Sequence, residues 1–370
     1  MQTDGEAAAR VSQRKLEHLE LALNGGVEGP TGPGWEDVGL IHDCLPEIDL
    51  EDVVLTTDFL GHALRAPLWI TGMTGGHERA GVINARLAVA AERHGLAMGL
   101  GSQRAGLSTE SLMASYQAAR EAAPSAILLA NIGAPQLVSQ DGHPALTIPD
   151  LQRIIDSISA QGLAIHLNFL QEMVQPEGDR NARGCLAAIG EVAAALDVPV
   201  LAKETGAGIS RKRAVSLREA GMAAIDVGGA GGTSMVRVEG ARARQNHDGR
   251  APYARTFEGW GIPTAASVLE ARDCGVPVIA TGGIRSGLDA AKALALGAHA
   301  VGVGLPFLTA ANESEAALEE TICQFLGELR IALFLSGSAS PAEIAAQGAV
   351  LFGKLWAWAV QRGLRAGWVH

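Results

Sequence analysis

The sequence has few of the features that mark secreted, zinc-stabilised or membrane-spanning proteins. Only four of its 370 residues are cysteines, and Cys44, Cys185, Cys274 and Cys323 lie far apart with no Cys-x-x-Cys pair. Such spacing favours reduced thiols over a disulfide framework or a zinc site. The N-terminus is polar and acidic, unlike a secretory signal, and no apolar run reaches the ~18 residues of a membrane span. The sequence therefore predicts a cytoplasmic protein that does not insert into membranes.

Positive charge is also scarce. Charged residues make up 19% of the chain and the formal net charge is −11. This balance provides no electrostatic footprint for nucleic acid or an anionic membrane surface. Hydrophobic residues, in contrast, make up 48%, enough to build the core of one large domain or two ordinary ones.

Short apolar runs recur along the chain and alternate with amphipathic stretches such as 80–94, 183–196 and 286–296. The runs lie at 67–71, 96–100, 126–131, 163–168, 198–203, 223–228, 277–281 and 299–303. Nearly continuous hydrophobic runs are typical of parallel strands buried on both faces. Eight strand–helix units in about 250 residues predict an α/β fold of the closed (β/α)₈ type, a TIM barrel. A doubly wound open sheet is the alternative, although no Gly-x-Gly-x-x-Gly follows the first strand.

The barrel prediction divides the chain into three parts within one structural domain. Residues 1–60 form an N-terminal extension, with a helix at 8–23 and a glycine- and proline-rich loop at 25–34. Residues 61–310 form the barrel. Residues 311–370 are expected to form C-terminal helices packed on its outside.

Polar or glycine-rich segments follow nearly every predicted strand. Barrel enzymes place their active sites at these carboxyl-terminal strand ends, so the side chains found there are expected to meet. The segments are Thr71 to Thr74, Gly101 to Arg104, Asn131, Asn168 to Glu172, Lys203-Glu204, Gly228 to Ser234, Gly282 to Arg285 and Gly302 to Gly304.

The segment after the fourth strand is the richest in reactive groups. His166 and Asn168 point to the same side of a strand because side chains alternate along it, and Gln171 and Glu172 follow where the strand gives way to a loop. An imidazole, two amides and a carboxylate could together hold an anion, a metal and a reacting carbon. A polar strand end with a solvated loop is the plainer interpretation.

Two glycine-rich turns suit a phosphate group. Gly282-Gly283 leads into a helix whose start has the capping spacing of Ser286 and Asp289, and Gly302-x-Gly304 ends the eighth strand. Glycines permit close approach of the backbone, and a helix N-terminus supplies free N–H donors. Ordinary tight turns also favour glycine, but the loops after strands seven and eight are the usual phosphate site of barrels.

Lys203 ends the fifth strand and is expected to point into the barrel mouth. A lysine there can form a Schiff base or place a cation beside an electron-rich ring. A purely structural salt bridge is the less favoured interpretation.

Taken together, these motifs resemble type II isopentenyl diphosphate isomerase, an FMN-dependent barrel enzyme. The resemblance runs in order along nearly the whole chain. It comprises Arg14-Lys15, Met73-Thr-Gly-Gly76, Ser102-Gln-Arg104, His166-x-Asn168-x-x-Gln171-Glu172, Gln175-Pro-Glu-Gly-Asp179, Lys203-Glu204, Gly231-Gly-Thr-Ser234, Gly282-Gly-Ile284 and Leu305-Pro-Phe307.

The resemblance implies a role for each matching position. FMN would be held by Thr71, Gly72, Met73, Thr74, Ser102, Asn131, Lys203, Thr233, Gly282, Gly283, Ile284, Arg285, Gly302 and Gly304. The prenyl diphosphate would contact Arg14, Lys15, His18, Ser102, Gln103, Arg104, His166, Asn168 and Gln171. Glu172 would ligate Mg²⁺ together with substrate phosphate oxygens, which suits the preference of this ion for one or two carboxylates plus phosphate.

The N-terminal helix is interpreted with the help of the resemblance. Arg14, Lys15 and His18 share one face, which alone would indicate a solvated basic surface. The resemblance implies instead that the helix covers the barrel mouth and clamps the diphosphate. The arginine-rich insert at 237–261 could cover the mouth or form a subunit contact. Met235 and Phe169 depart from the family's usual aromatic residue and proline, which concerns the shape of the alkyl pocket.

The implied reaction interconverts isopentenyl and dimethylallyl diphosphate in isoprenoid biosynthesis. A proton is added at C4 and one is removed at C2, with reduced FMN as acid and base, Gln171 and Lys203 as catalytic residues, and NADPH as the reductant. The resemblance also implies a homo-oligomer, either a tetramer or an octamer.

Three other functions are weighed against this one. An FMN-dependent 2-hydroxy-acid oxidase needs a histidine base near strands six and seven, yet none follows Asp226 until His247. A Schiff-base lyase would use Lys203. A paralogue that only binds flavin or prenyl diphosphate would be expected to lack Gln171 or Glu172, and both are present.

Overall fold

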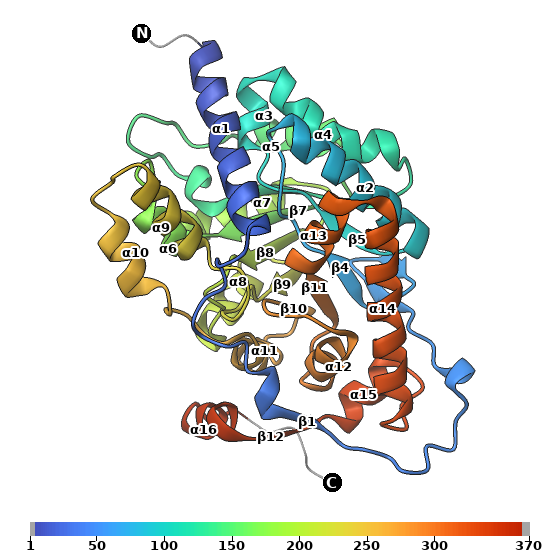
Figure 1. The fold of residues 1–370 in the computed structure, drawn as a ribbon. Helices are drawn as coiled ribbons and strands as arrows, with labels where there is room; N and C mark the ends of the chain where they lie inside the picture. Colours follow the sequence, from blue (N-terminus) through green and yellow to red (C-terminus); the bar gives the residue numbers. More distant parts are fainter. Residues whose placement is uncertain (1–3, 365–370) are drawn as a thin grey trace.

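The computed structural model describes residues 4–364, and its centre is a closed barrel of eight parallel strands (Figure 1). The strands follow one another around the barrel in chain order. They are β4 (Leu68–Ile70), β5 (Ala97–Gly99), β6 (Ile127–Gly133), β7 (Gly162–Leu167), β8 (Val200–Glu204), β9 (Ala224–Asp226), β10 (Val278–Thr281) and β11 (Ala300–Val303), with β11 pairing back to β4. The barrel prediction is confirmed, and the open-sheet alternative is wrong.

Each of the eight predicted strands is present. The largest differences, of two residues, fall at the end of β6, the start of β8 and the end of β9. The prediction succeeded because parallel strands covered on both faces must be apolar throughout, so each strand appears in the sequence as a short, clearly bounded apolar run.

Alternate strand residues fill the barrel interior. Trp69, Leu129, Leu201 and Ile279 are buried there together with small alanines from the other strands. The hairpin of β2 (Thr57–Phe59) and β3 (His62–Leu64) adds Phe59 to this layer, and the Phe59 ring meets Trp69 edge to face at 5.9 Å. The interior below the mouth is therefore packed with side chains, as in other barrels of eight strands.

Helices surround the strands. They are α2 (Glu78–His94), α3 (Arg104–Ser108), α4 (Glu110–Ala122), α5 (Ile148–Ser157), α6 (Phe169–Val174), α7 (Cys185–Ala195), α8 (Arg211–Glu219), α9 (Met235–Gln245), α10 (Ala251–Phe257), α11 (Thr264–Ala271), α12 (Gly287–Ala295) and α13 (Leu305–Glu313), with the 3-10 turn η3 (Ala134–Leu137). The helices predicted at 80–94, 183–196 and 286–296 are α2, α7 and α12. The insert at 237–261 lies within α9, α10 and their connections.

The two ends of the chain pack on the outside of the barrel. Before it come α1 (Asp4–Leu23), η1 (Trp35–Asp37), β1 (Val38–Leu40) and η2 (Leu50–Asp52). After it come α14 (Glu315–Phe334), α15 (Pro341–Gln347), β12 (Ala349–Leu351) and α16 (Gly353–Gln361). The expected C-terminal helices are found, but β12 was missed. It pairs antiparallel with β1, more than 300 residues away in the sequence, at the opposite end of the molecule from α1 (Figure 1). Residues 365–370, part of the same prediction, lie outside the described residues.

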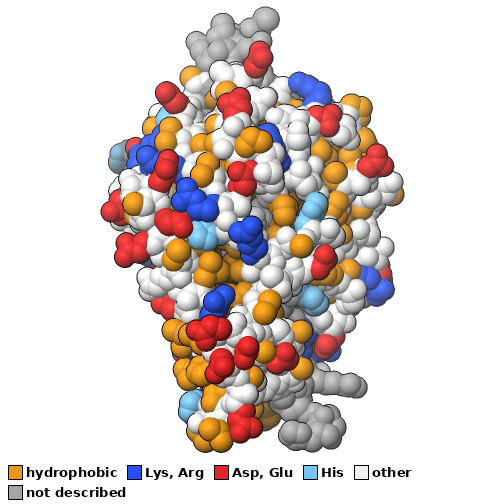
Figure 2. Space-filling view, turned by 90° about the vertical axis from the view of Figure 1, so that its right-hand side faces the viewer, with side chains coloured by type: hydrophobic (Ala, Val, Ile, Leu, Met, Phe, Trp, Pro, Cys, Tyr) orange, Lys and Arg blue, Asp and Glu red, His pale blue; other side chains and the backbone are white. Residues whose placement is uncertain are grey.

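Charged side chains of both signs are spread over one face of the molecule (Figure 2). On the face in Figure 2, basic and acidic side chains are interspersed rather than gathered into a basic stripe. Among the described residues, no helix has the length and apolarity needed to cross a membrane.

Candidate active site

A cavity of about 810 Å³ opens at the carboxyl-terminal end of the barrel. Its wall includes residues from the ends of all eight barrel strands and from α1. Of the predicted site residues, those that line it are Arg14, Lys15, His18, Thr71, Gly72, Met73, Ser102, Arg104, Asn131, His166, Asn168, Gln171, Glu172, Lys203, Thr233, Gly282, Gly283, Ile284, Arg285, Gly302 and Gly304. Sequence positions almost 300 residues apart thus converge on one space.

Thr74 and Gln103 are the two predicted residues that do not line the cavity. Gln103 is fully buried, and its backbone N–H donates to the carbonyl of Asn131 while its Oε1 accepts from the Asn131 N–H. The Thr74 carbonyl accepts from the Gly101 N–H and from the Asn84 side chain. Both residues support the segments that form the wall.

A glycine cradle occupies the mouth at β10 and β11. Gly283 has φ +67°, and a Cβ on Gly302 would come within 2.0 Å of Thr281 Oγ1. The hydroxyls of Thr71 and Thr281 are buried at this wall with no hydrogen-bond partner among the described residues. Close backbone approach and unpartnered donors fit a phosphorylated cofactor such as FMN.

The start of α12 beside this cradle is capped much as the sequence predicts. Ser286 Oγ accepts from the Asp289 N–H at 3.1 Å. Asp289 in turn accepts from the N–H of Arg285 rather than from that of Ser286 itself. The two contacts satisfy amides at the helix start and fix the turn that carries Gly282 and Gly283.

The ends of β7, β8 and β9 bring His166, Lys203 and Asp226 side by side. His166 pairs with Lys203 in the strand register, and Lys203 pairs with Asp226. Lys203 Nζ lies 2.8 Å from Asp226 Oδ2, and the carboxylate is fully buried. The sequence pattern indicated no partner for Lys203, because the pairing with Asp226 follows from the register of the neighbouring strands β8 and β9.

His166 is held as a neutral imidazole. Burial, with the nearby charges of Lys15 and Lys203, lowers the pKa of His166 to about 3. Its Nδ1 lies 2.8 Å from Asn131 Oδ1, and the Asn131 amide nitrogen donates to the Leu100 carbonyl. Since Asn131 thus presents an acceptor, Nδ1 carries the proton and Nε2 carries the lone pair.

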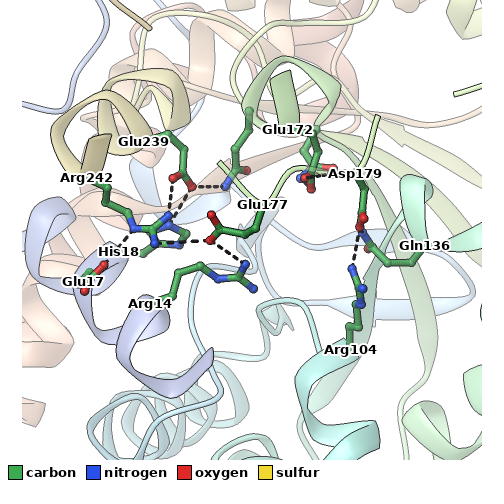
Figure 3. Close-up of polar contacts among 12 residues, drawn as sticks. Arg14, Glu17, His18, Arg104, Gln136, Glu172, Glu177, Asp179, Glu239 and Arg242 are labelled. Carbon is green, nitrogen blue, oxygen red and sulfur yellow. Dashed lines mark hydrogen bonds and ion pairs between the residues drawn. The ribbon is translucent and has the colours of Figure 1, made fainter. Parts of the chain in front are cut away.

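Glu239, a fully buried carboxylate on α9, joins α1 to α6 (Figure 3). Its Oε1 accepts from Gln171 Nε2 at 3.0 Å and lies 2.9 Å from His18 Nε2, and its Oε2 lies 2.6 Å from Arg242 Nη1. Arg242 also lies 3.0 Å from Glu17 on α1. Burial alone would raise the pKa of Glu239, but the contacts with His18, Arg242 and Gln171 lower it to about 2.

The position of α9 supports one of the two interpretations of the insert at 237–261, that it lies at the barrel mouth. Glu239 and Arg242 belong to that insert and contact α1 directly, so this part of the insert lies at the mouth. Figure 1 shows α9 and α10 beside α1 and α6. Glu239 and Arg242 pair with each other within α9, but their contacts with α1 and α6 could not be assigned from the sequence, because those helices lie far away in the chain.

Glu172 is held at the wall by two donors. Asn168 Nδ2 donates to its Oε1 and the Asp179 N–H donates to its Oε2, both at 2.8 Å. Burial raises the pKa of Glu172 despite these contacts. The Asn168 Oδ1 is buried without a partner among the described residues. A carboxylate beside an unpartnered amide oxygen fits a hard cation such as Mg²⁺.

Arg14 and Arg104 at the mouth already have carboxylate partners. Arg104 lies 2.7 Å from Asp179, which also accepts from Gln136. Arg14 lies 3.2 Å from Glu177 (Figure 3). Lys15 has no such pair at contact distance among the described residues. Its burial, with the charge of Arg14, lowers its pKa to about 8.

Glu204 organises the loop after β8. One oxygen of its carboxylate accepts from the backbone N–H groups of Thr205, Gly206, Ala207 and Gly208. Burial nevertheless outweighs these donors and raises the pKa of Glu204 to about 7. The Glu204 carboxylate therefore holds the backbone of the loop after β8 in place, a role that could not be predicted from the sequence.

The two departures from the family pattern lie in different places. Met235 lines the cavity, so its side chain can shape the space for an alkyl group. Phe169 instead lines a second, separate cavity of about 720 Å³ between α7, α8 and α16, although Glu204 reaches both cavities.

The fold and this wall define a flavin-binding (β/α)₈ barrel. Residues 168–352 match the family model described as FMN-dependent dehydrogenase. A lactate oxidase from Pediococcus acidilactici shares the fold with a TM-score of 0.63 at 15% identity, covering 94% of each chain. A mandelate oxidase with (S)-mandelic acid gives 0.60 at 21% identity, covering 94% of this chain and 98% of that one.

Closer relatives define the family within this class. The isopentenyl-diphosphate delta-isomerase of Methanosarcina barkeri is 46% identical over 354 residues, 95% of either protein. That of Ignicoccus hospitalis is 45% identical, covering 97% of this chain and 99% of the relative. That of Methanoregula boonei is 48% identical over 89% and 90%. The chain belongs to the isopentenyl-diphosphate delta-isomerase family.

Proposed function

We propose that this protein interconverts isopentenyl diphosphate and dimethylallyl diphosphate, as the names of its relatives state for them. The observation that carries the proposal is the meeting of Arg14 and Lys15 from α1 with Gln171, Glu172 and Lys203 from the barrel around one cavity. The cavity thus has cationic side chains that can bind an anionic group, a carboxylate that can bind a metal and an oriented amide. It also has the glycine cradle that suits a phosphate.

FMN fits the residues of the cavity wall. Gly282, Gly283 and Gly302 would hold its phosphate, while Thr71 and Thr281 offer hydroxyls that lack protein partners. When bound, reduced FMN would supply the proton donor and acceptor without net oxidation of the substrate. NADPH as the reductant, a homo-oligomeric tetramer or octamer and a cytoplasmic location complete the proposal.

The diphosphate would bind under α1. Arg14 and Arg104 would exchange part of their contact with Glu177 and Asp179 for phosphate oxygens, and Lys15 would gain the counter-charge that it lacks. The same anion would draw a proton onto Nε2 of His166, whose pKa is low partly because of neighbouring cations. Because α1 contributes to the wall on this side of the cavity, it would limit the access of water to the bound diphosphate.

Mg²⁺ would be held by Glu172 and the unpartnered oxygen of Asn168, together with substrate phosphate. Among residues 4–364, the single group of three potential protein ligands at metal spacing is His94, Glu319 and Cys323, which lies away from the cavity. A site with one protein carboxylate is therefore consistent with an ion that arrives with a phosphorylated substrate.

The chemistry adds a proton at C4 and removes one at C2 through a state with positive charge at the tertiary carbon. Gln171 would orient or relay the C2 proton because its amide is fixed by Glu239. Exclusion of water from the closed site would protect the cationic carbon. Lys203 would stabilise negative charge on the bound ring.

The oxidase alternative is disfavoured by the histidines of the cavity. His18, His143 and His166 line it, and none follows β9 or β10. His247 lies beyond the end of α9 and does not line the cavity. A histidine base in the position that a hydroxy-acid oxidase requires is thus missing from the described wall.

An anaerobic NMR assay in D₂O with FMN, NADPH, Mg²⁺ and isopentenyl diphosphate tests the proposal. Deuterated dimethylallyl diphosphate is expected only when the flavin is reduced. A folded protein with confirmed FMN reduction and no conversion would contradict it. Oxygen uptake with a 2-hydroxy acid would support the oxidase, and borohydride trapping of a carbonyl substrate on Lys203 would support a lyase.

A further inference from the structure

Asp226 lies behind Lys203 as viewed from the cavity. Lys203 lines the cavity, whereas Asp226 does not, and the Asp226 side chain has no solvent exposure. Lys203 Nζ donates to Oδ2 at 2.8 Å, and the Gly228 N–H donates to Oδ1 at 3.1 Å. Both carboxylate oxygens are thus engaged, and the whole group is fixed at the start of the loop after β9.

Burial of the Asp226 carboxylate costs folding free energy, which suggests that its charge has a role in the site. Removing an ion from water is compensated by a pair only when the geometry is good, and an apolar pair of equal volume is often at least as stable. Asp226 offsets part of the positive charge that Lys203 alone would present to the wall. The nearest other titratable side chains in the strand register and chain are His166, which is neutral, and Glu204, which is occupied by backbone amides.

We propose that Asp226 is a positioning and charge-compensating residue that sets the reduction potential of the bound FMN by neutralising Lys203. This inference rests on the proposed placement of the flavin ring beside Lys203. The ring gains negative charge on reduction, and an uncompensated lysine would stabilise that charge. Compensation keeps the reduced ring more electron-rich and more basic, which suits a cofactor that must accept a proton from carbon.

The test is the midpoint potential of the FMN-loaded protein, measured by anaerobic reductive titration against a reference dye without substrate. Asp226→Asn is expected to shift the potential upward. A tenfold gain in the preference for reduced over oxidised FMN corresponds to about 30 mV for a two-electron couple. Lys203→Gln is expected to shift the potential downward, and the double variant is expected to return close to the parent value.

Glu270→Gln is the matched control. Glu270 is also a buried carboxylate with a cationic partner, Arg362 Nε at 2.6 Å, but it lies on α11 and does not line the cavity. Its replacement is expected to lower thermal stability without moving the flavin potential. An equal shift in Glu270→Gln and Asp226→Asn would overturn the proposal, because the effect would then be global.

An unchanged potential in a folded, FMN-loaded Asp226→Asn variant would also overturn the proposal and leave Asp226 a structural role only. If that variant does not fold, the comparison of Lys203→Gln with the double variant decides, since the double variant leaves no unpaired buried charge. An upward shift between those two supports the proposal, and no shift overturns it. Because the potential is read without substrate, an absent isomerase activity would count against the proposed function alone.

Discussion

Gln171 on α6 donates its amide N–H to the carboxylate of Glu239 on α9 at 3.0 Å. Glu239 is fully buried and its pKa is lowered to about 2, so it accepts as an anion across the whole physiological range. The anionic carboxylate of Glu239 therefore fixes the orientation of the Gln171 side-chain amide. No described residue donates a hydrogen bond to the side-chain oxygen of Gln171. Because Glu239 also contacts His18, the position of α1 and the orientation of Gln171 depend on the same carboxylate.

Gln171→Ala is expected to bind FMN normally and to lose turnover by about 10²–10⁴-fold, the usual contribution of a group that assists proton transfer. The side chain lines the cavity but lies on α6, away from the glycine cradle, so the flavin site stays intact. The NMR assay gives turnover, and the flavin absorbance spectrum gives cofactor content. Gln152→Ala, at an exposed position on α5, is the control and should retain activity. Normal turnover in Gln171→Ala would show that this role is wrongly assigned.

Glu172→Gln is expected to raise the Mg²⁺ concentration needed for half-maximal activity by at least about tenfold. Glutamine keeps the size of the side chain and one acceptor, but it loses the negative charge that attracts the ion. Because burial raises the pKa of Glu172, the parent protein is also expected to need more Mg²⁺ as pH falls and the carboxylate takes up its proton.

Titrations of activity with Mg²⁺ after treatment with a chelator measure this effect. Glu177→Gln is the matched control, since Glu177 contacts Arg14 and Arg242 rather than Asn168. It should change the KM for the diphosphate and leave the Mg²⁺ dependence as it was. Equal Mg²⁺ curves for Glu172→Gln and the parent would exclude Glu172 as the ligand.

Gly283→Ala is expected to weaken FMN binding at least about tenfold. Its φ of +67° is costly for a residue with a Cβ, and that Cβ would lie 2.5 Å from the Gly231 carbonyl oxygen. The turn must therefore move, and the phosphate cradle moves with it. Gly327→Ala, where a Cβ on α14 meets nothing within 4 Å, should leave FMN affinity unchanged. Fluorescence titration of the apoprotein with FMN distinguishes the two, and equal affinities would contradict the cradle.

The barrel could be predicted because its evidence is local. Each strand is a short apolar run, and each exit is a polar or glycine-rich segment next to it in the sequence. His166, Asn168, Gln171 and Glu172 could be grouped in advance for the same reason, since they lie within seven consecutive residues at the end of β7, the start of α6 and the junction between them.

What the sequence could not supply are partners brought together by tertiary structure. Asp226 lies 23 positions from Lys203, and Glu239 lies 68 positions from Gln171. Strand β12 has only three residues, and its pairing with β1 closes almost the full length of the chain. The set of residues that line the cavity could not be predicted in full either, because Thr74 and Gln103 belong to the expected segments but do not line the cavity.

Lys15 is expected to limit substrate binding at alkaline pH. Burial and the charge of Arg14 lower the pKa of Lys15 to about 8, so the free protein prefers its uncharged form more than an unfolded chain does. The burial penalty on folding is thus fully present below about pH 8 and is relieved as pH rises further. The effect of pH on binding of an anionic substrate has the opposite sign, because the positive charge of Lys15 that would attract the substrate is lost above pH 8.

The kcat/KM for the diphosphate should therefore decrease as pH rises above about 8, and the decrease should come from a higher KM rather than from a lower kcat. Lys15→Gln should have lower kcat/KM at neutral pH and lack this limb, whereas Arg14→Gln should lose affinity and keep it. An unchanged limb in Lys15→Gln would assign the titration to another group.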